Sequence, residues 1–221
     1  MKRILSYIWP QTTKVNSDYN GILEVTFING RKILDSKNAN YSFGSLQQIL
    51  EIGISKIDLK NVDSILLLGL GGGSIVSSLR NKFGFNKKII AVELDQKVID
   101  IAQKEFFISS SDTLVIKKYD AFNFVKNSNN QYDLIIVDLF IDNQVPKQFY
   151  TEEFCNNLSN IITTKGSIIF NLGINQINKD KRNSVINYFY NKKEYKTFQY
   201  EKILGTNSLL IANKTTNKKS L

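Results

Sequence analysis

The 221-residue sequence contains no histidine and a single cysteine, Cys155. Without histidine, a serine–histidine–aspartate hydrolase is excluded, and a general base must be a carboxylate, a lysine, a tyrosine or the lone thiol. One cysteine cannot form an internal disulfide, and the shortage of histidine and cysteine ligands argues against a zinc or non-haem iron site. We therefore expect no bound metal ion.

Long apolar runs are absent as well. The basic start of the chain is followed by an apolar stretch that is too short for a secretory signal, and Pro10 interrupts it. No run approaches the ~20 apolar residues that are needed to cross a bilayer. These absences predict no membrane partner and a cytoplasmic location.

Basic residues outnumber acidic ones, and the formal net charge is +9. Such an excess suggests nucleic acid as one class of partner. The basic residues are scattered, however, with local clusters only at 86–88, 191–193 and 214–220. A solvated basic surface is therefore favoured over a nucleic-acid-binding stripe, which stays open as an alternative.

The apolar pattern along the chain predicts an α/β protein. Residues 1–20 show no clear period, whereas 21–28 and 31–35 are β-like runs around Asn29-Gly30, which is typical of a hairpin. From Ser64 onward, strand-like and helix-like segments alternate, which predicts a parallel sheet with helices on both faces and a final antiparallel pair. The strand-like runs are 65–68, 89–92, 113–116, 134–137, 167–170 and 209–212, with 195–200 weaker. The helix-like runs are 43–57, 74–83, 96–106, 121–127, 148–162 and 175–191.

A glycine-rich turn, Gly69-Leu70-Gly71-Gly72-Gly73, follows the first strand-like run of this series. Glycine adopts positive φ freely and lets the backbone approach a ligand closely, and the helix that follows offers unpaired N–H groups. The next strand-like run ends in Glu93-Leu94-Asp95. A strand, a glycine turn, a helix, a strand and an acid together predict half of a Rossmann-like nucleotide site.

Three further carboxylates come shortly after predicted strands. They are Asp120, which precedes Ala121, then Asp138, and Asp142 shortly after it. Ligands of open α/β sheets bind beyond the carboxyl ends of the strands, and so many acids would repel a pyrophosphate. A ligand with ribose hydroxyls, an adenine amino group and a cationic sulfonium fits better, as in S-adenosylmethionine or its decarboxylated form. Asp95 is expected to cap a helix rather than to touch the ligand.

These motifs resemble the spermidine synthase family, which has the class I S-adenosylmethionine-dependent methyltransferase fold. The resemblance rests on the ordered series of the glycine turn, 92–95, 132–138, Val145-Pro146 and 149–154. It implies a seven-stranded sheet whose last strand is antiparallel, with a small N-terminal β element over the site. It also implies that Glu93 holds the ribose, Asp120 the adenine and Asp138 the reacting end, where Asp138 would help to deprotonate an attacking amine.

The sequence departs from that family at the cofactor and acceptor sides. Gly72 stands where aminopropyltransferases usually carry an aspartate that disfavours a methionine carboxylate, and 138–142 is one residue longer than the family's pattern. The favoured hypothesis is therefore a methyltransferase that uses S-adenosylmethionine on an unknown acceptor, with Asp138 as base and Tyr41 and Asp142 on the acceptor side. The alternatives are an aminopropyltransferase that uses decarboxylated S-adenosylmethionine and an amine, and a non-catalytic adenosyl- or RNA-binding protein. An NAD-dependent dehydrogenase is disfavoured by the acidic rim.

The chain is expected to divide into three parts. Residues 1–57 would form the N-terminal hairpin and first helix, 58–213 the S-adenosyl-binding domain, and 214–221 a polar tail. A homodimer paired through the hairpin is an open alternative.

Overall fold

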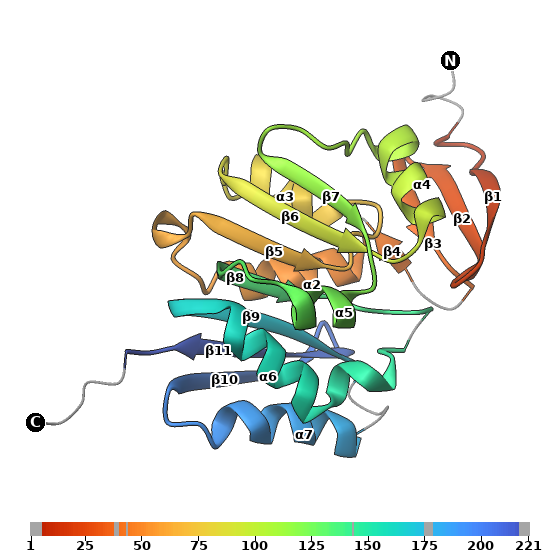
Figure 1. Cartoon of the computed structure of the whole chain (residues 1–221). Coiled ribbons are helices and arrows are strands. Elements are labelled where there is room, and N and C mark those ends of the chain that lie inside the picture. Colours follow the sequence, from red (N-terminus) through yellow and green to blue (C-terminus); the bar gives the residue numbers. More distant parts are fainter. Residues whose placement is uncertain (1–5, 38–39, 43, 143, 175–178, 217–221) are drawn as a thin grey trace, which may run out of the picture.

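The computed structural model describes residues 6–37, 40–42, 44–142, 144–174 and 179–216. They form two sheets, one small and one large (Figure 1). The small sheet is antiparallel, and its strands lie in chain order: β1 (Gln11–Ser17), β2 (Gly21–Ile28), β3 (Arg31–Asp35) and β4 (Asn40–Ser42). The large sheet contains β5 (Ser64–Leu68), β6 (Lys88–Glu93), β7 (Leu114–Lys118), β8 (Tyr132–Val137), β9 (Ile162–Ile174), β10 (Tyr195–Ile203) and β11 (Asn207–Lys214).

The large sheet has seven strands in the order β10-β11-β9-β8-β5-β6-β7. Strand β5 pairs in parallel with β6 on one side and with β8 on the other, whereas β11 is antiparallel to both of its neighbours. The predicted α/β architecture with a final antiparallel pair is therefore confirmed. The strand order reverses between β5 and β8, and such a switch point opens a crevice at the carboxyl ends of the strands.

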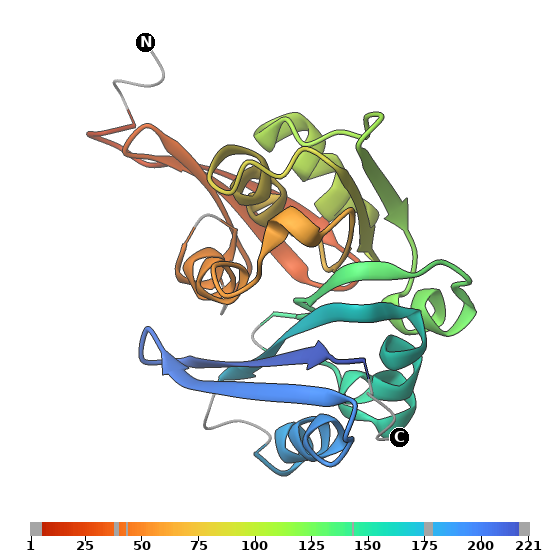
Figure 2. The same cartoon turned by 90° about the vertical axis from the view of Figure 1, so that its left-hand side faces the viewer.

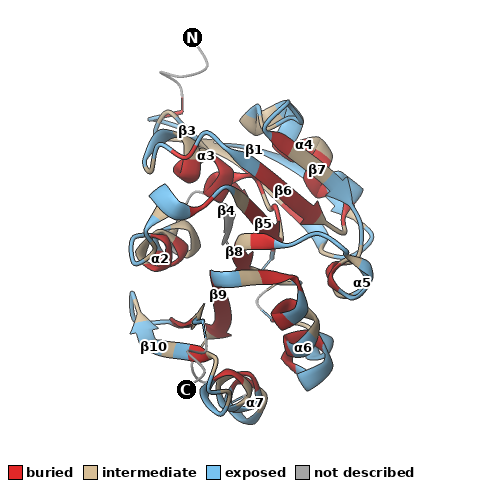
Figure 3. Ribbon diagram, turned by 60° about the vertical axis from the view of Figure 1, so that its left-hand side comes forward, coloured by how far each residue is buried: buried red, intermediate tan, exposed pale blue. Residues whose placement is uncertain are grey.

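Helices cover both faces of the large sheet (Figure 2). They are α2 (Ser45–Ile54), α3 (Ser74–Asn81), α4 (Gln96–Phe106), α5 (Ala121–Asn127), α6 (Glu152–Ile161) and α7 (Lys179–Tyr190), with short turns at η1 (Leu59–Asn61) and η2 (Lys147–Tyr150). Helices α2, α3 and α4 share one apolar core with the sheet, and α5, α6 and α7 share the other. Buried side chains accordingly concentrate on the central strands, between the two helical layers (Figure 3).

The N-terminal hairpin is confirmed and is part of a wider sheet than the sequence indicates. Asn29 and Gly30 both have positive φ, as a tight turn between β2 and β3 requires. Strand β1 was not expected, because its residues are polar and lack apolar alternation. It forms because its backbone pairs with β2 over its whole length, and most of its side chains stay exposed.

The expected helix at 148–162 is divided at Thr151, whose hydroxyl accepts a hydrogen bond from the Phe154 N–H and so begins α6. Helix α2 packs into the core of the large sheet through Ile49, Leu50 and Ile54, while Leu23 of the small sheet packs against α4. The domain division at residue 57 stays a prediction.

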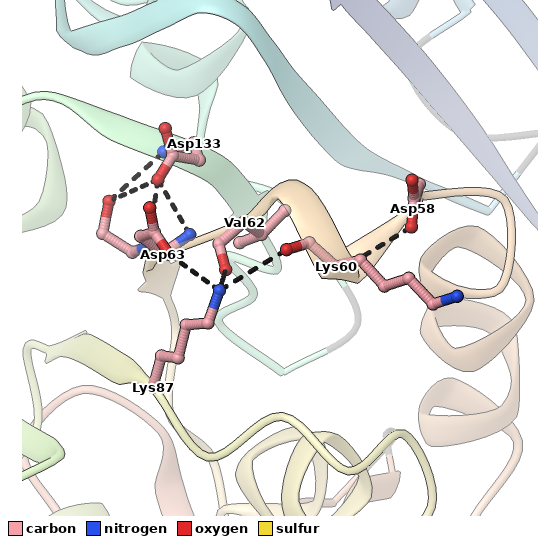
Figure 4. A network of polar contacts seen from close by, with 7 residues as sticks. Asp58, Lys60, Val62, Asp63, Lys87 and Asp133 are labelled. Carbon is pink, nitrogen blue, oxygen red and sulfur yellow. Dashed lines mark hydrogen bonds and ion pairs between the residues drawn. The ribbon is translucent and has the colours of Figure 1, made fainter.

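A polar network joins β5 to β8 at the end of the sheet opposite to the crevice (Figure 4). The Asp133 carboxylate accepts hydrogen bonds from the N–H groups of Asp63 and Ser64, both at 3.0 Å, and from the Thr163 hydroxyl at 2.9 Å. Burial raises the pKa of Asp133, but these donors outweigh it, so the pKa is lower than usual. Lys87 in turn contacts the Asp63 carboxylate at 2.7 Å.

Candidate active site

A cavity of about 340 Å³ lies at the carboxyl ends of β5, β6, β7 and β8. Its wall comes from the glycine turn after β5, the ends of β6 and β7, residues 138–142, and the turn between β1 and β2. A volume of this size is typical of small-molecule sites. The small sheet therefore contributes part of the wall, as the resemblance implied for an N-terminal β element over the site.

The glycine turn is shaped by close packing against the next loop. Gly69, Gly71 and Gly73 all have positive φ. A Cβ atom at Gly69 would lie 2.1 Å from the carbonyl oxygen of Asp138, so no side chain fits there. The Asp138 N–H donates to the Leu68 carbonyl at 2.8 Å, which fixes the two loops together at the switch point.

Glu93 joins the turn after β5 to the turn after β6. Its Oε2 accepts hydrogen bonds from the N–H groups of Leu70 (3.1 Å) and Gly71 (3.4 Å), and its Oε1 from those of Leu94 (2.9 Å) and Asp95 (3.1 Å). Burial nevertheless raises the pKa of Glu93; the N–H donors of Asp95, Leu70 and Gly71 oppose this rise, and the negative charge of Asp95 adds to it. Four backbone N–H donors thus orient this carboxylate at the cavity wall. Its contact with ribose hydroxyls stays a prediction.

Asp95 and Asp120 both cap helices. Asp95 Oδ1 accepts from the Lys97 N–H at 2.8 Å, which confirms the expected cap of α4, and its Oδ2 accepts from the side chains of Ser17 and Asn20. The buried Asp95 thus ties the β1–β2 turn to the cavity. Asp120 caps α5, where its Oδ1 accepts from the Asn123 N–H at 2.9 Å, and it also lines the cavity beside Ala121. Its contact with an adenine amino group stays a prediction.

Asp138 follows β8 and faces the cavity. Its Oδ1 accepts a hydrogen bond from the Asn171 side chain at 2.9 Å. Burial raises the pKa of Asp138 to about 6; the Asn171 bond opposes this change, and the nearby negative charge of Glu93 adds to it. A carboxylate with this pKa is mostly ionised at neutral pH and is still a better proton acceptor than an ordinary aspartate.

Asp142 lies on the loop that leaves Asp138 and also lines the cavity. Its Oδ1 accepts a hydrogen bond from the Ser36 hydroxyl at 2.7 Å, so the loop contacts the small sheet just after β3. Its φ is positive. This contact holds the Asp142 carboxylate on the cavity wall.

Three residues of the predicted glycine cradle are buried in the fold instead of lining the cavity. Leu70, Gly72 and Gly73 are buried and are not among the described residues that line the cavity. Gly73 caps α3, where a Cβ atom would strike the Ile108 side chain. For Tyr41 only the backbone is described, within β4, so its predicted acceptor role falls outside the described residues.

Several residues of the site belong to no motif in the sequence, and Tyr19, Asn20 and Asn171 are among them. Tyr19 and Asn20 line the cavity from the β1–β2 turn, and Asn171 reaches Asp138 from β9. Tyr19 and Asn20 lie in a segment without a periodic pattern, and Asn171 lies inside an apolar strand rather than after one. The one sequence signal for Asn171 was that it is a polar residue that interrupts an apolar run.

The cavity wall is acidic although the chain is basic. Among the described lining residues there are carboxylates but no lysine or arginine. The acidic lining residues are Glu93, Asp95, Asp120, Asp138 and Asp142. A wall of this charge favours ligands that carry positive charge.

The sheet order and this cavity define a protein of the Rossmann-like methyltransferase fold with an acidic small-molecule cavity at its switch point. The family model of the spermine/spermidine synthase domain matches residues 47–201. The chain therefore belongs to the spermine/spermidine synthase domain family, a family of transferases. In the part of the chain that is described, no helix is both long and apolar enough to span a bilayer.

Curated relatives agree with this family. The chain is 30% identical over 112 residues to the polyamine aminopropyltransferase of Vibrio vulnificus, a match that covers 49% of this chain and 37% of the relative. It is 37% identical over 124 residues to polyamine aminopropyltransferase 2 of Aquifex aeolicus, covering 52% of this chain and 24% of that one. The matches thus span well under half the length of these relatives.

Solved structures show the same fold at low identity. A probable spermidine synthase from Corynebacterium glutamicum superimposes with a TM-score of 0.71 at 17% identity, covering 93% of this chain and 81% of that one. Human methyltransferase-like protein 13 in complex with SAH gives a TM-score of 0.65 at 20% identity, covering 81% and 86%. Aminopropyltransferases and methyltransferases therefore share this architecture, and the fold alone does not choose between them.

Proposed function

We propose that this protein is an aminopropyltransferase that moves an aminopropyl group from decarboxylated S-adenosylmethionine to an amine. The observation that carries the proposal is the acidic cavity wall, which has no basic residue among its described members. The decarboxylated cofactor and an amine acceptor are both cationic, whereas intact S-adenosylmethionine adds a carboxylate that this wall would repel. The names of the curated relatives support the same reaction. Aminopropyl transfer, the alternative reading of the sequence, is thus favoured over methyl transfer.

The bound cofactor supplies an activated carbon: the amine nitrogen forms a bond to the carbon attached to sulfur, and the carbon–sulfur bond breaks with its electron pair passing to sulfur. The residues of this chain orient the reactants. Glu93 would accept from the ribose hydroxyls and Asp120 from the adenine amino group. Asp138 would take the proton that the amine loses, and Asp142 would hold a second ammonium group of the acceptor.

Methyl transfer from intact S-adenosylmethionine is the second candidate, and Gly72 favours it. Gly72 has no side chain that would repel a methionine carboxylate in the glycine turn. Two further hypotheses, a nucleic-acid partner, which is not favoured, and a homodimer paired through the N-terminal hairpin, stay open alternatives.

Calorimetric titration with the two cofactors, followed by product analysis with putrescine, tests the proposal. We expect tighter binding of the decarboxylated cofactor and formation of an aminopropylated amine. Asp138→Asn should bind the cofactor and lose turnover, whereas Asp112→Asn, at an exposed position near the other end of the sheet, should keep both. Tight binding of only the intact cofactor, without aminopropyl transfer, would reject the proposal in favour of methyl transfer.

A further inference from the structure

Asn171 is a buried amide whose orientation is determined by its surroundings. Its side chain is 1% exposed. Its Oδ1 accepts a hydrogen bond from the Gly173 N–H at 3.2 Å, and a backbone N–H can only donate. The amide oxygen must therefore face Gly173, which leaves Nδ2 to donate to Asp138 Oδ1 at 2.9 Å. Asn171 can thus serve as a donor to this carboxylate, and not as an acceptor.

A second buried amide supports the first. Asn207, at the start of β11 and 3% exposed, donates from Nδ2 to Asn171 Oδ1 at 3.1 Å. The pairing of β11 with β9 shifts register between Asn207 and Leu209. Gly173 has a positive φ of 80°, so β9 also departs from regular strand geometry at this place. The two irregular strand ends together bring the two amides into contact.

We propose that Asn171 is a positioning residue for Asp138 and that Asn207 acts through Asn171, so that two buried amides orient the proton-accepting carboxylate. This inference rests on the proposed function. The backbone of Asp138 is held by its bond to Leu68, but that bond leaves the side-chain rotamer free. The Asn171 donor occupies Oδ1, while no hydrogen bond from the described residues to Oδ2 is found, so Oδ2 would be the oxygen that takes the proton of the acceptor.

The proposed arrangement also affects how Asp138 titrates. A donor to the ionised form opposes the rise in pKa that burial causes. Losing the amide should therefore make Asp138 harder to ionise. It should also free the side chain to adopt rotamers that do not align with an acceptor amine.

The test measures the titration of Asp138 directly, by carbon-13 NMR of labelled aspartate carboxyl groups in the full chain without substrate. The Asp138→Asn variant assigns the signal. The test variants are Asn171→Leu, Asn207→Leu and the double variant. Asn213→Leu is the matched control, because Asn213 accepts a hydrogen bond from Ser167 on the same pair of strands at the other end of the sheet.

We expect Asn171→Leu to move the Asp138 midpoint upward by about one pH unit, the size of one hydrogen bond to a charged group. Asn207→Leu should move it in the same direction by less, and the double variant should match Asn171→Leu, because Asn207 acts through Asn171. The acid limb of the pH profile of kcat should move with the Asp138 titration midpoint, and the cofactor affinity should change little. Asn213→Leu should move neither.

Three results would overturn the proposal: an unchanged midpoint in Asn171→Leu, an unchanged midpoint in Asn207→Leu, or shifts that simply add in the double variant. Because Asn207 does not touch Asp138, Asn207→Leu carries the test if Asn171→Leu does not fold, as judged by near-ultraviolet circular dichroism. The NMR titration needs no turnover. A wild-type protein without aminopropyl transfer would therefore reject the proposed function while the role of the two amides is still tested.

Discussion

Replacing Asp138 by asparagine should stabilise the folded protein at neutral pH. The wild-type carboxylate must ionise in a buried position, where its pKa rises from 3.8 to about 6. An asparagine has nearly the same shape, can still accept the bond from Asn171, and carries no charge that would have to be desolvated. The variant should therefore lose activity and gain stability, as expected for a strained functional group.

The magnitude follows from linkage. Because the folded-state pKa is raised above the unfolded one, the stability that Asp138 contributes is fully present below pH 3.8 and is lost as pH rises through about 6. One pKa unit corresponds to about 1.4 kcal/mol, so a change from 3.8 to about 6 costs the wild type about 3 kcal/mol at pH 7.5. At pH 4.5 the same relation gives a smaller cost to the wild type, about 1 kcal/mol.

Urea unfolding at these two pH values is the assay. Asp133→Asn is the matched control, because Asp133 lies at the start of β8 and Asp138 just after its end. The pKa of Asp133 is lowered, so its contribution is present above pH 3.8 and is lost only as pH falls below that value. Asp133→Asn should therefore be destabilised by about 1–3 kcal/mol at both pH values.

The two variants are expected to change the free energy of unfolding in opposite directions, so comparing them separates the effect of burial at Asp138 from a general effect of removing a carboxylate. An Asp138→Asn variant that is no more stable than the wild type at pH 7.5 would refute the reasoning that burial dominates at this carboxylate. A stability gain that does not shrink between pH 7.5 and pH 4.5 would also refute it, because the gain would then come from something other than ionisation.

Two further predictions concern the glycine turn and Glu93. Gly69→Ala should abolish cofactor binding, and in thermal unfolding it should destabilise the fold by more than positive-φ strain alone, because the new Cβ would strike Asp138. Positive-φ strain costs about 1–2 kcal/mol. The control Gly84→Ala, at positive φ in open space, should cost only that strain. Glu93→Ala should weaken S-adenosyl binding about tenfold or more in calorimetry, since it removes charge-assisted hydrogen bonds of about 1.5–3 kcal/mol each. Equal stability of the two glycine variants, or unchanged affinity without Glu93, would contradict the site as described.

Much of the site was predictable because it lies where strands end. Glu93 and Asp138 each follow an apolar run directly, and Asp120 follows one closely, so the sequence placed them at the same edge of a parallel sheet before their neighbours were known. The cap at Asp95 and the hairpin at Asn29 were predictable for a similar reason, since both depend on residues a few positions apart. Local sequence determines such features because the contacts that make them are local.

The tertiary structure alone decided what surrounds those carboxylates. Asp95 binds Ser17 and Asn20 across the two sheets, Asp138 receives its hydrogen bond from Asn171, and Asp142 contacts Ser36. These partners are separated from the carboxylates by 33 residues or more in sequence, and no local pattern marks them. Burial, the charge of Glu93 and the amide of Asn171 determine the pKa of Asp138, and all three depend on how distant strands pack. The sequence therefore determined which acids meet at the edge of the sheet, and only packing decided how each of them is oriented and charged.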